Sequence, residues 1–320
     1  MDLYNKMPDF AKAFRDVLAE TLDRMFSENE KLVYLDADLV NAIKTGVLFE
    51  KYPERAIDCG IAEANMIGVA AGLAANGFVP FTHTFGTFAS RRVFDQVFLS
   101  VAYAGCPVKM IGSDPGVCAE LNGGTHMPFE DIALMRAVPT MVVAEPADAT
   151  SLEALIEQIA DNGAPSYIRI PRKRKYYLYE HKWDVVLGKA NTLREGTDVT
   201  LIASGIMVEQ ALIAAENLAK EDINARVIDM HTIKPLDEDA VLKACEETGA
   251  IVTCENHNYI GGLYSAVCEA VCGSCPVPVE PVGVLDQFGE VGPIDYLQAK
   301  FGLTAKDIEV KAKFAISRKK

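Results

Sequence analysis

The chain of 320 residues lacks any run of 18 apolar residues, and its first six residues lack the pattern of a signal peptide. A helix that crosses a membrane needs roughly 20 mostly apolar residues in succession, so no such helix is predicted. The sequence also has no low-complexity tract and no short-period repeat. We therefore expect a folded protein of the cytoplasm.

Basic residues are scarce relative to acidic ones: 31 Lys and Arg face 45 Asp and Glu, which gives a net charge of -14. The acidic residues are spread along the chain instead of gathering in a tail. This balance argues against nucleic acid and anionic membranes as main partners. The one basic run, at residues 172–175, is interpreted as part of a solvated linker.

The eight cysteines are too few for a disulfide scaffold, and without an export signal we expect them to stay reduced. Cys268, Cys272 and Cys275 have a spacing that some iron–sulfur enzymes use. However, the first two lie in a segment with the pattern of an amphipathic helix, and no fourth ligand is evident. Packing as small apolar side chains explains them better.

Short apolar segments alternate with helical ones, which predicts an α/β fold with a mostly parallel sheet flanked by helices. We expect a first domain at residues 1–175, a linker at 176–189 and a second, smaller α/β domain at 190–320. The predicted strands are 31–38, 78–83, 106–112, 140–144 and 166–171 in the first domain, and 198–205, 225–230, 250–256 and 277–284 in the second. The main predicted helices are 7–29, 63–76, 148–161, 207–220 and 237–248.

Glu63 opens a predicted helix whose other residues are small or apolar, among them Ile61, Ala62 and Met66. The helix dipole favours an acidic residue in a first turn, and this is the simplest explanation of Glu63. Yet a carboxylate is seldom buried among apolar neighbours without a partner to bond. Glu63 is therefore a candidate functional residue.

Other candidates follow the predicted strands, because ligands bind at the carboxyl ends of strands in open α/β sheets. Asp36 and Asp38 end the first strand, and a long polar loop at residues 113–128 follows the third. In the segment 84–98, Phe88, Arg91 and Phe94 lie near one helical face. They either pack in the core or form a pocket for a flat heteroaromatic group, which arginine can stack on.

Across nearly its whole length the chain resembles the C-terminal half of transketolase, in the form that is split into two subunits. The motifs are Leu-Asp-Ala-Asp-Leu at 35–39, Gly-Ile-Ala-Glu-Ala-Asn-Met at 60–66, Gly-Gly-Thr-His at 123–126 and Ile-Lys-Pro-Leu-Asp at 233–237. Deoxyxylulose-phosphate synthases and the beta subunits of 2-oxo-acid dehydrogenases are similar too, and they remain alternatives. A non-catalytic regulatory or scaffold paralogue is the alternative of another class.

The resemblance implies thiamine diphosphate as cofactor, with Glu63 bonded to a nitrogen of its pyrimidine ring. It also implies that Phe88 stacks on this ring and that Arg91 and Phe94 complete the pocket. The remaining residues implied near the cofactor are Asp38 and Ile61.

For the substrate, the resemblance implies that His126 faces the sugar and that Arg172 binds its phosphate. Asp114 stands where transketolases commonly have a histidine, and Asn122 stands where an aspartate usually reads the sugar hydroxyls. A serine of the phosphate site corresponds to Ala42, and an arginine is missing near Ala11. These departures predict a variant ketose, either without phosphate or with a different charge.

The Gly-Asp-Gly…Asn motif that holds the diphosphate and its metal in this family is absent from the sequence. The resemblance thus implies a partner, an N-terminal transketolase subunit that holds the diphosphate with Mg²⁺ or Ca²⁺, and no metal ligand in this chain. It further implies a heterotetramer that moves a two-carbon ketol unit between sugars, as in the pentose phosphate pathway.

Overall fold

The computed structural model describes residues 11–319, which form two compact units. The first contains residues 11–115 and 137–187, and the second contains residues 116–136 and 188–319. Residues 7–10 of the predicted first helix lie outside the described part. Among the helices of residues 11–319, none is both long and apolar enough to cross a membrane.

The first unit is built on a parallel sheet, as the alternating sequence pattern predicts. Its strands lie in the order β5-β6-β4-β3-β1-β2, and every pair among them is parallel. Strands β1, β4 and β6 are buried along their whole length, which is typical of a sheet covered on both faces. The bounds are β1 (Leu32–Asp36), β2 (Ala56–Asp58), β3 (Val79–Phe85), β4 (Lys109–Ser113), β5 (Val142–Ala144) and β6 (Ser166–Ile170).

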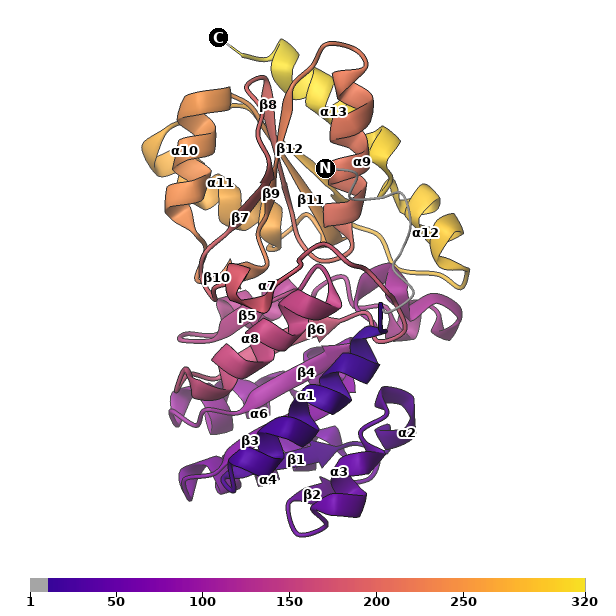
Figure 1. Cartoon of the computed structure of the whole chain (residues 1–320), viewed down its shortest axis with the longest axis vertical. Helices are drawn as coiled ribbons and strands as arrows, with labels where there is room; N and C mark the ends of the chain where they lie inside the picture. The colour runs from indigo at the N-terminus through magenta and orange to yellow at the C-terminus, as the bar shows by residue number, and fades with distance from the viewer. Residues whose placement is uncertain (1–10, 320) are drawn as a thin grey trace. The chain divides into compact units, whose positions relative to one another are not determined.

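Helices α1 (Phe14–Glu28) and α8 (Ala149–Asp161) lie side by side along this sheet (Figure 1). Each buries an apolar stripe, and α8 begins with a capping box in which the Asp148 carboxylate accepts from the Ser151 N–H at 2.7 Å. The other helices of this unit before residue 86 are α2 (Val40–Ile43), α3 (Gly46–Lys51) and α4 (Glu63–Ala75).

Residues 86–103 form a chain of short helical segments instead of the one helix expected after a turn. A break at Ser90, with φ −115° and ψ −85°, separates α5 from the 3₁₀ turn that follows it. The segments are α5 (Gly86–Ala89), η1 (Arg91–Val93), α6 (Phe94–Gln96) and the π-helical η2 (Val97–Tyr103). These breaks set the directions in which the side chains of Arg91 and Arg92 point.

The second unit holds its own sheet in the order β12-β11-β8-β9-β7, parallel except that β7 runs antiparallel to β9. Helices α9 (Met207–Ala219) and α13 (Ala305–Ser317) pack side by side, and α10 (Glu238–Thr248) packs beside α11 (Leu263–Ser274) (Figure 1). The strands of this sheet are β7 (Asn191–Arg194), β8 (Val199–Ala203), β9 (Ala225–Asp229), β11 (Ile251–Asn258) and β12 (Val279–Val284). Further elements are β10 (Thr232–Lys234), α7 (Asp131–Ala137) and α12 (Ile294–Phe301).

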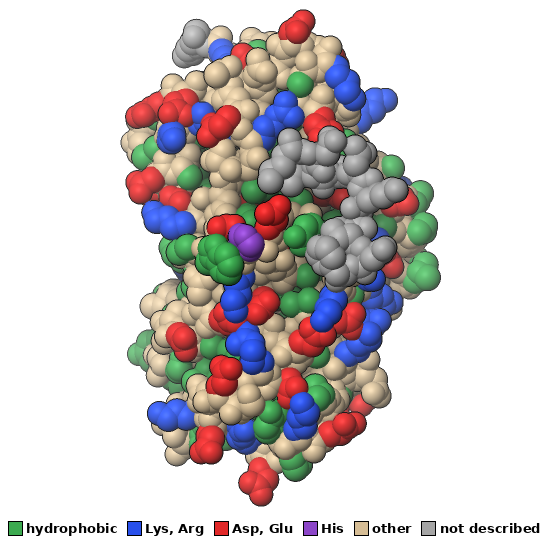
Figure 2. All heavy atoms as spheres, in the orientation of Figure 1, with side chains coloured by type: hydrophobic (Ala, Val, Ile, Leu, Met, Phe, Trp, Pro, Cys, Tyr) green, Lys and Arg blue, Asp and Glu red, His purple; other side chains and the backbone are tan. Residues whose placement is uncertain are grey.

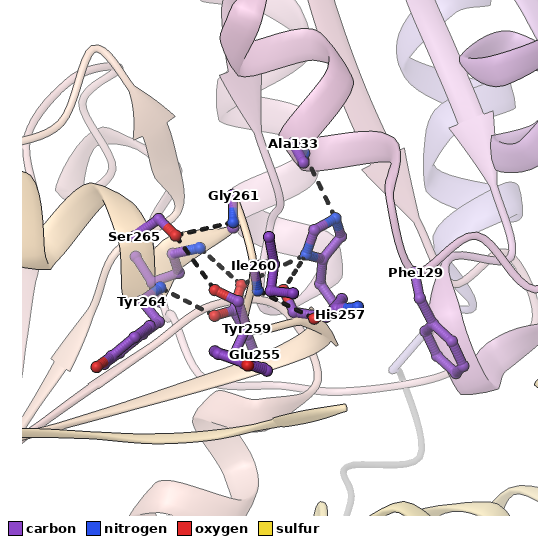
Figure 3. Close-up of polar contacts among 12 residues, drawn as sticks. Phe129, Ala133, Glu255, His257, Tyr259, Ile260, Gly261, Tyr264 and Ser265 are labelled. Carbon is purple, nitrogen blue, oxygen red and sulfur yellow. Dashed lines mark hydrogen bonds and ion pairs between the residues drawn. The ribbon is translucent and has the colours of Figure 1, made fainter. Parts of the chain in front are cut away.

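A buried glutamate caps α11, the helix that carries the clustered cysteines (Figure 3). The carboxylate of Glu255 accepts from the N–H groups of Leu263 at 2.6 Å and Tyr264 at 2.9 Å. A Cβ at Gly262 would lie 1.9 Å from Glu255 Oε2, so only glycine fits there. Cys268 is half-buried and Cys272 exposed on this helix, and both are free thiols. Glu255 thus has a structural role.

Acidic and basic side chains are interspersed on the face of the molecule drawn in Figure 2. One group of ion pairs joins α8 to α1 and to the 3₁₀ turn η5 (Lys182–Asp184): Glu157 of α8 binds both Arg24 and Lys182, the latter at 2.7 Å. These side chains are between 28% and 41% exposed, so such pairs contribute little stability each.

Candidate functional site

The ends of three neighbouring strands in the first unit carry a buried chain of hydrogen bonds. His83 Nδ1 lies 2.8 Å from Asp36 Oδ2, and His83 Nε2 lies 3.1 Å from Ser113 Oγ. Tyr34 donates its hydroxyl to the same Asp36 oxygen at 2.9 Å, and burial raises the pKa of Tyr34. Because both nitrogens of its buried ring are bonded, His83 has its partners in the core.

Glu63 is the first residue of α4, and it is buried, with 5% of its surface exposed. Its Oε1 accepts a hydrogen bond from Arg92 Nη1 at 2.7 Å, while its Oε2 accepts none from residues 11–319. The Arg92 side chain is 46% exposed. The carboxylate therefore has one oxygen available to a ligand, beside a cation that solvent can reach.

An aromatic ring lies under this ion pair. The guanidinium carbon of Arg92 is 3.8 Å from the centroid of Phe88, a cation–π contact, and Phe88 meets Phe85 edge to face. Phe94 opens α6 and contacts Phe98, with the ring centroids 6.2 Å apart. Arg91, which the sequence favoured for this pocket, is exposed in the 3₁₀ turn, and the arginine on Glu63 is its neighbour.

Asp38 and Ile61 lie in two loops that share one hydrogen-bond acceptor. Asp58 Oδ1 accepts from the backbone N–H of Asp38 at 3.0 Å and of Gly60 at 2.9 Å. Asp38 has φ 60°, in the left-handed region that aspartate tolerates, and Ile61 is 76% exposed. Asp58 thus fixes the backbone on which both residues stand.

Asp114 and Arg172 form a second acid–arginine pair, buried on both sides. Arg172 Nε donates to Asp114 Oδ2 at 2.6 Å, and its Nη1 donates to the Ala42 carbonyl at 3.1 Å. The side chains of Arg172 and Asp114 are 9% and 6% exposed. Burial raises the pKa of Asp114, and the Arg172 guanidinium opposes this rise. Asp114 also has φ 53°, in the same left-handed region as Asp38.

Asn122 and His126 belong to the second unit, in which residues 116–126 form two short 3₁₀ segments, η3 (Gly116–Asn122) and η4 (Gly124–His126). Asn122 is exposed, and His126 Nδ1 lies 2.9 Å from Thr125 Oγ1. The predicted roles of both residues toward substrate stay predictions.

Sequence reasoning missed two arginines of the first unit. Arg92 was visible as the second of two consecutive arginines, but the helical breaks before it hide which one faces Glu63. Arg15 reaches the Ala42 carbonyl with its Nη1 at 3.4 Å, near Arg172. Arg15 lies four residues after Ala11, the position near which the family resemblance places an arginine.

The arrangement can bind a flat, polar ring: Glu63 offers a carboxylate oxygen and Phe88 an aromatic face. Within the described residues, no group of three or more His, Cys, Asp or Glu side chains is placed to hold a metal ion. Glu63 and Phe88 provide acid–base and stacking contacts.

Both halves of the chain match domains of the same protein family. Residues 11–176 match the family model of the transketolase pyrimidine binding domain, and residues 188–308 match that of the transketolase C-terminal domain. A 6-deoxy-6-sulfo-D-fructose transketolase subunit of a Clostridium species is 54% identical, over 96% of this chain and 95% of that protein.

A subunit of the apulose-4-phosphate transketolase of Phocaeicola vulgatus is 36% identical, over 95% of this chain and 96% of that protein. Among solved structures, a split-gene transketolase described as an inactive beta4 tetramer has a TM-score of 0.90 at 40% identity. The match spans 96% of this chain and 99% of the chain in that structure.

Proposed function

Because the chain belongs to the transketolase family, we propose that it is the C-terminal subunit of a split, thiamine diphosphate-dependent transketolase. In this proposal it transfers a two-carbon ketol unit from a ketose donor to an aldose acceptor. The observation that carries the proposal is the buried carboxylate of Glu63 beside the Phe88 ring, within a pyrimidine-binding domain.

The residues present fit the pyrimidine end of the cofactor. Glu63 Oε2 has no partner in the described chain and would accept from a ring N–H, and Phe88 would stack on the ring. When bound, thiamine diphosphate supplies a carbanion and an electron sink for cleaving a carbon–carbon bond. Glu63 would hold the proton at the pyrimidine nitrogen, because a charge-assisted bond in a dry site is stronger than one in water.

Other residues would orient this end of the cofactor. Arg92 would hold Glu63 in position and close the ring pocket over Phe88, a role for which the sequence had favoured Arg91. Phe94, Asp38 and Ile61 would complete the surroundings of the cofactor, and the 76% exposed Ile61 suits contact with a partner chain.

The diphosphate and its Mg²⁺ or Ca²⁺ would be bound by a partner, the N-terminal transketolase subunit. The 95% and 96% coverage of the two transketolase subunits supports this, because those relatives are subunits of about this length. We propose a heterotetramer, in which the Glu63 end of the first unit lies at the interface with the partner.

The Asp114 and Arg172 pair supports a variant sugar, because a carboxylate already occupies the arginine that would otherwise face a phosphate. Two relatives are named for unusual ketoses, one sulfonated and one a phosphate of apulose. Arg172, Asp114, Asn122 and His126 are the proposed substrate contacts.

The test is co-expression with an N-terminal subunit, followed by a screen of ketose donors and aldose acceptors with thiamine diphosphate and Mg²⁺. We expect ketol transfer by the assembled pair and none by this chain alone. Dehydrogenase-type decarboxylation of a 2-oxo acid, or synthesis of deoxyxylulose phosphate, would replace the proposal by one of its alternatives. A stable, cofactor-loaded complex without ketol transfer to any acceptor would contradict it.

A further inference from the structure

The loop that carries two of the proposed substrate contacts, Asn122 and His126, is bonded to the sheet of the second unit. Residues 116–136 belong to this unit together with residues 188–319. Just after the loop, the carbonyl of Phe129 accepts from the backbone N–H of Asn258, the last residue of β11, at 3.0 Å. The end of a strand more than a hundred residues along the chain thus holds the segment that contains the loop.

Asn256, near the end of β11, holds the start of the loop. It is fully buried, and its Oδ1 accepts from the backbone N–H of Val117 at 2.9 Å. A Cβ at Gly116 would lie 2.1 Å from the same oxygen, so this close approach requires glycine. The Asn256 Nδ2 donates to Cys118 Sγ at 3.8 Å. One side chain of β11 therefore bonds two successive residues of η3.

Asn256 lies in an irregular part of its strand. Strand β11 pairs with β12 up to Cys254 and again at Asn258, and the register shifts between these positions. Bulges of this kind re-aim side chains and are frequent next to functional sites. His257, which follows Asn256, accepts from the N–H of Ala133 with its Nε2 at 3.4 Å, a contact drawn in Figure 3. Both side chains at the irregularity thus bond the segment that contains the loop.

A second contact holds the end of the loop. A Cβ at Gly124 would lie 2.3 Å from the carbonyl oxygen of Gly289, so two backbones touch here without side chains between them. A Cβ at Gly289 would in turn lie 3.0 Å from the Cβ of Met127, the buried residue after His126. The loop therefore has no room to shift toward Gly289.

We propose that Asn256 and Gly289 are positioning residues, which hold the loop so that Asn122 and His126 meet the sugar. This inference rests on the proposed function and gives the second unit a part in the reaction. Asn122 is exposed and His126 is half-buried, so the anchored backbone fixes where both side chains lie. A displacement of about 1 Å at a substrate contact can cost on the order of 10²-fold in rate.

The experiment uses the complex assembled with the N-terminal subunit, with 6-deoxy-6-sulfofructose, fructose 6-phosphate and fructose as donors. Asn256→Ala removes the acceptor of the Val117 N–H, and it should lower kcat/KM for the best donor about 10- to 100-fold. Asn256→Asp keeps an oxygen at the same place and should recover part of this loss. Binding of thiamine diphosphate should stay unchanged, because the loop holds none of the proposed cofactor contacts.

Gly289→Ala tests the second contact without removing a hydrogen bond. The added methyl group meets Met127 and Gly124, and it should lower the same kcat/KM, by less than Asn256→Ala does. The matched control is Gly273→Ala in α11, where an added Cβ meets no neighbouring atom within 4 Å. The control should turn over every donor as wild type does.

Combination with His126→Ala separates positioning from a general loss of structure. If Asn256 acts through the loop, the loss in the double variant is smaller than the product of the two single losses. Hydrogen exchange on the assembled complex gives a readout without turnover. Asn256→Ala should speed amide exchange at residues 116–127 and leave exchange in β8 unchanged.

Three results would overturn the inference while ketol transfer continues. In the first, Asn256→Ala and Gly289→Ala turn over every donor as the Gly273→Ala control does. In the second, the losses of Asn256→Ala and His126→Ala multiply, as they do for independent sites. In the third, exchange at residues 116–127 is the same in Asn256→Ala and wild type.

Failure of the proposed function gives a different result. Calorimetry of the three ketoses on the assembled complexes measures binding without turnover. If wild type binds a ketose more tightly than Asn256→Ala does, and no ketol transfer occurs, this inference stands and the proposed function is refuted.

Discussion

Two of the acid–arginine pairs in the first unit, Glu63 with Arg92 and Asp114 with Arg172, are alike in bond length and opposite in setting. Glu63 binds Arg92 at 2.7 Å, and Asp114 binds Arg172 at 2.6 Å. Arg92 is 46% exposed, whereas Arg172 is 9% exposed and also bound to a backbone carbonyl. An arginine in solvent can turn aside for a ligand at small cost, but a buried one cannot leave its acid.

We infer that the two pairs have different roles in the first unit. The Glu63 pair is open, with an oxygen available for a cofactor ring, and its acid is the reactive part. The Asp114 pair is closed, and it serves as a fixed charge that shapes the substrate's end of the site. An acid paired with an arginine thus has a different role in each case, because Arg92 is exposed and Arg172 is buried.

The largest expected effect comes from removing the buried arginine. Arg172→Met leaves the Asp114 carboxylate buried without its cation, which should lower the free energy of unfolding by about 3–5 kcal/mol. Denaturant unfolding of the isolated subunit measures it. If the free energy of unfolding fell by less than about 1 kcal/mol, the Asp114–Arg172 pair would be as open to solvent as the Glu63–Arg92 pair.

The same substitution at the exposed pair should do much less. Arg92→Met should lower the free energy of unfolding by less than about 1 kcal/mol, since Arg92 is 46% exposed and its removal opens the Glu63 carboxylate to water. The effect should appear instead as weaker binding of thiamine diphosphate to the assembled complex. Equal losses of stability in the two arginine variants would remove the distinction between the open and the closed pair.

The smallest effect is a change in pH dependence. Because burial raises the pKa of Asp114, the folded state holds a proton there above the usual pH range of an aspartate. The free energy of unfolding should therefore fall as pH rises from about 4 through the raised pKa. Asp114→Asn should abolish this fall, because an amide does not titrate in this range. Parallel pH curves for the two proteins would contradict the raised pKa.

Much of this architecture could be predicted from the sequence, because it depends on local patterns. The apolar run before Asp36 and the alternation of strands with helices indicated the parallel sheet, and the motif around Glu63 led to the family, which the comparisons confirm. The start of α4 at Glu63 follows from the small residues behind it.

The arginines could not be assigned in this way. Whether Arg91 or Arg92 faces Glu63 depends on the breaks around Ser90, which change the rotation per residue from that of a regular helix. Arg15 reaches Ala42 across 27 positions of sequence, and only the packing of α1 brings them together. Such contacts depend on tertiary structure, so the sequence pattern within one segment cannot predict them.

The central claim is that Glu63 is the cofactor-polarising carboxylate of a transketolase whose other half is a separate subunit. The most direct measurement is ketol transfer by the complex carrying Glu63→Gln, with Glu50→Gln, an exposed carboxylate on α3, as the matched control. We predict a loss of about 10²- to 10⁴-fold for Glu63→Gln with unchanged assembly, and no loss for Glu50→Gln. Activity of the Glu63→Gln complex near that of wild type would contradict this claim.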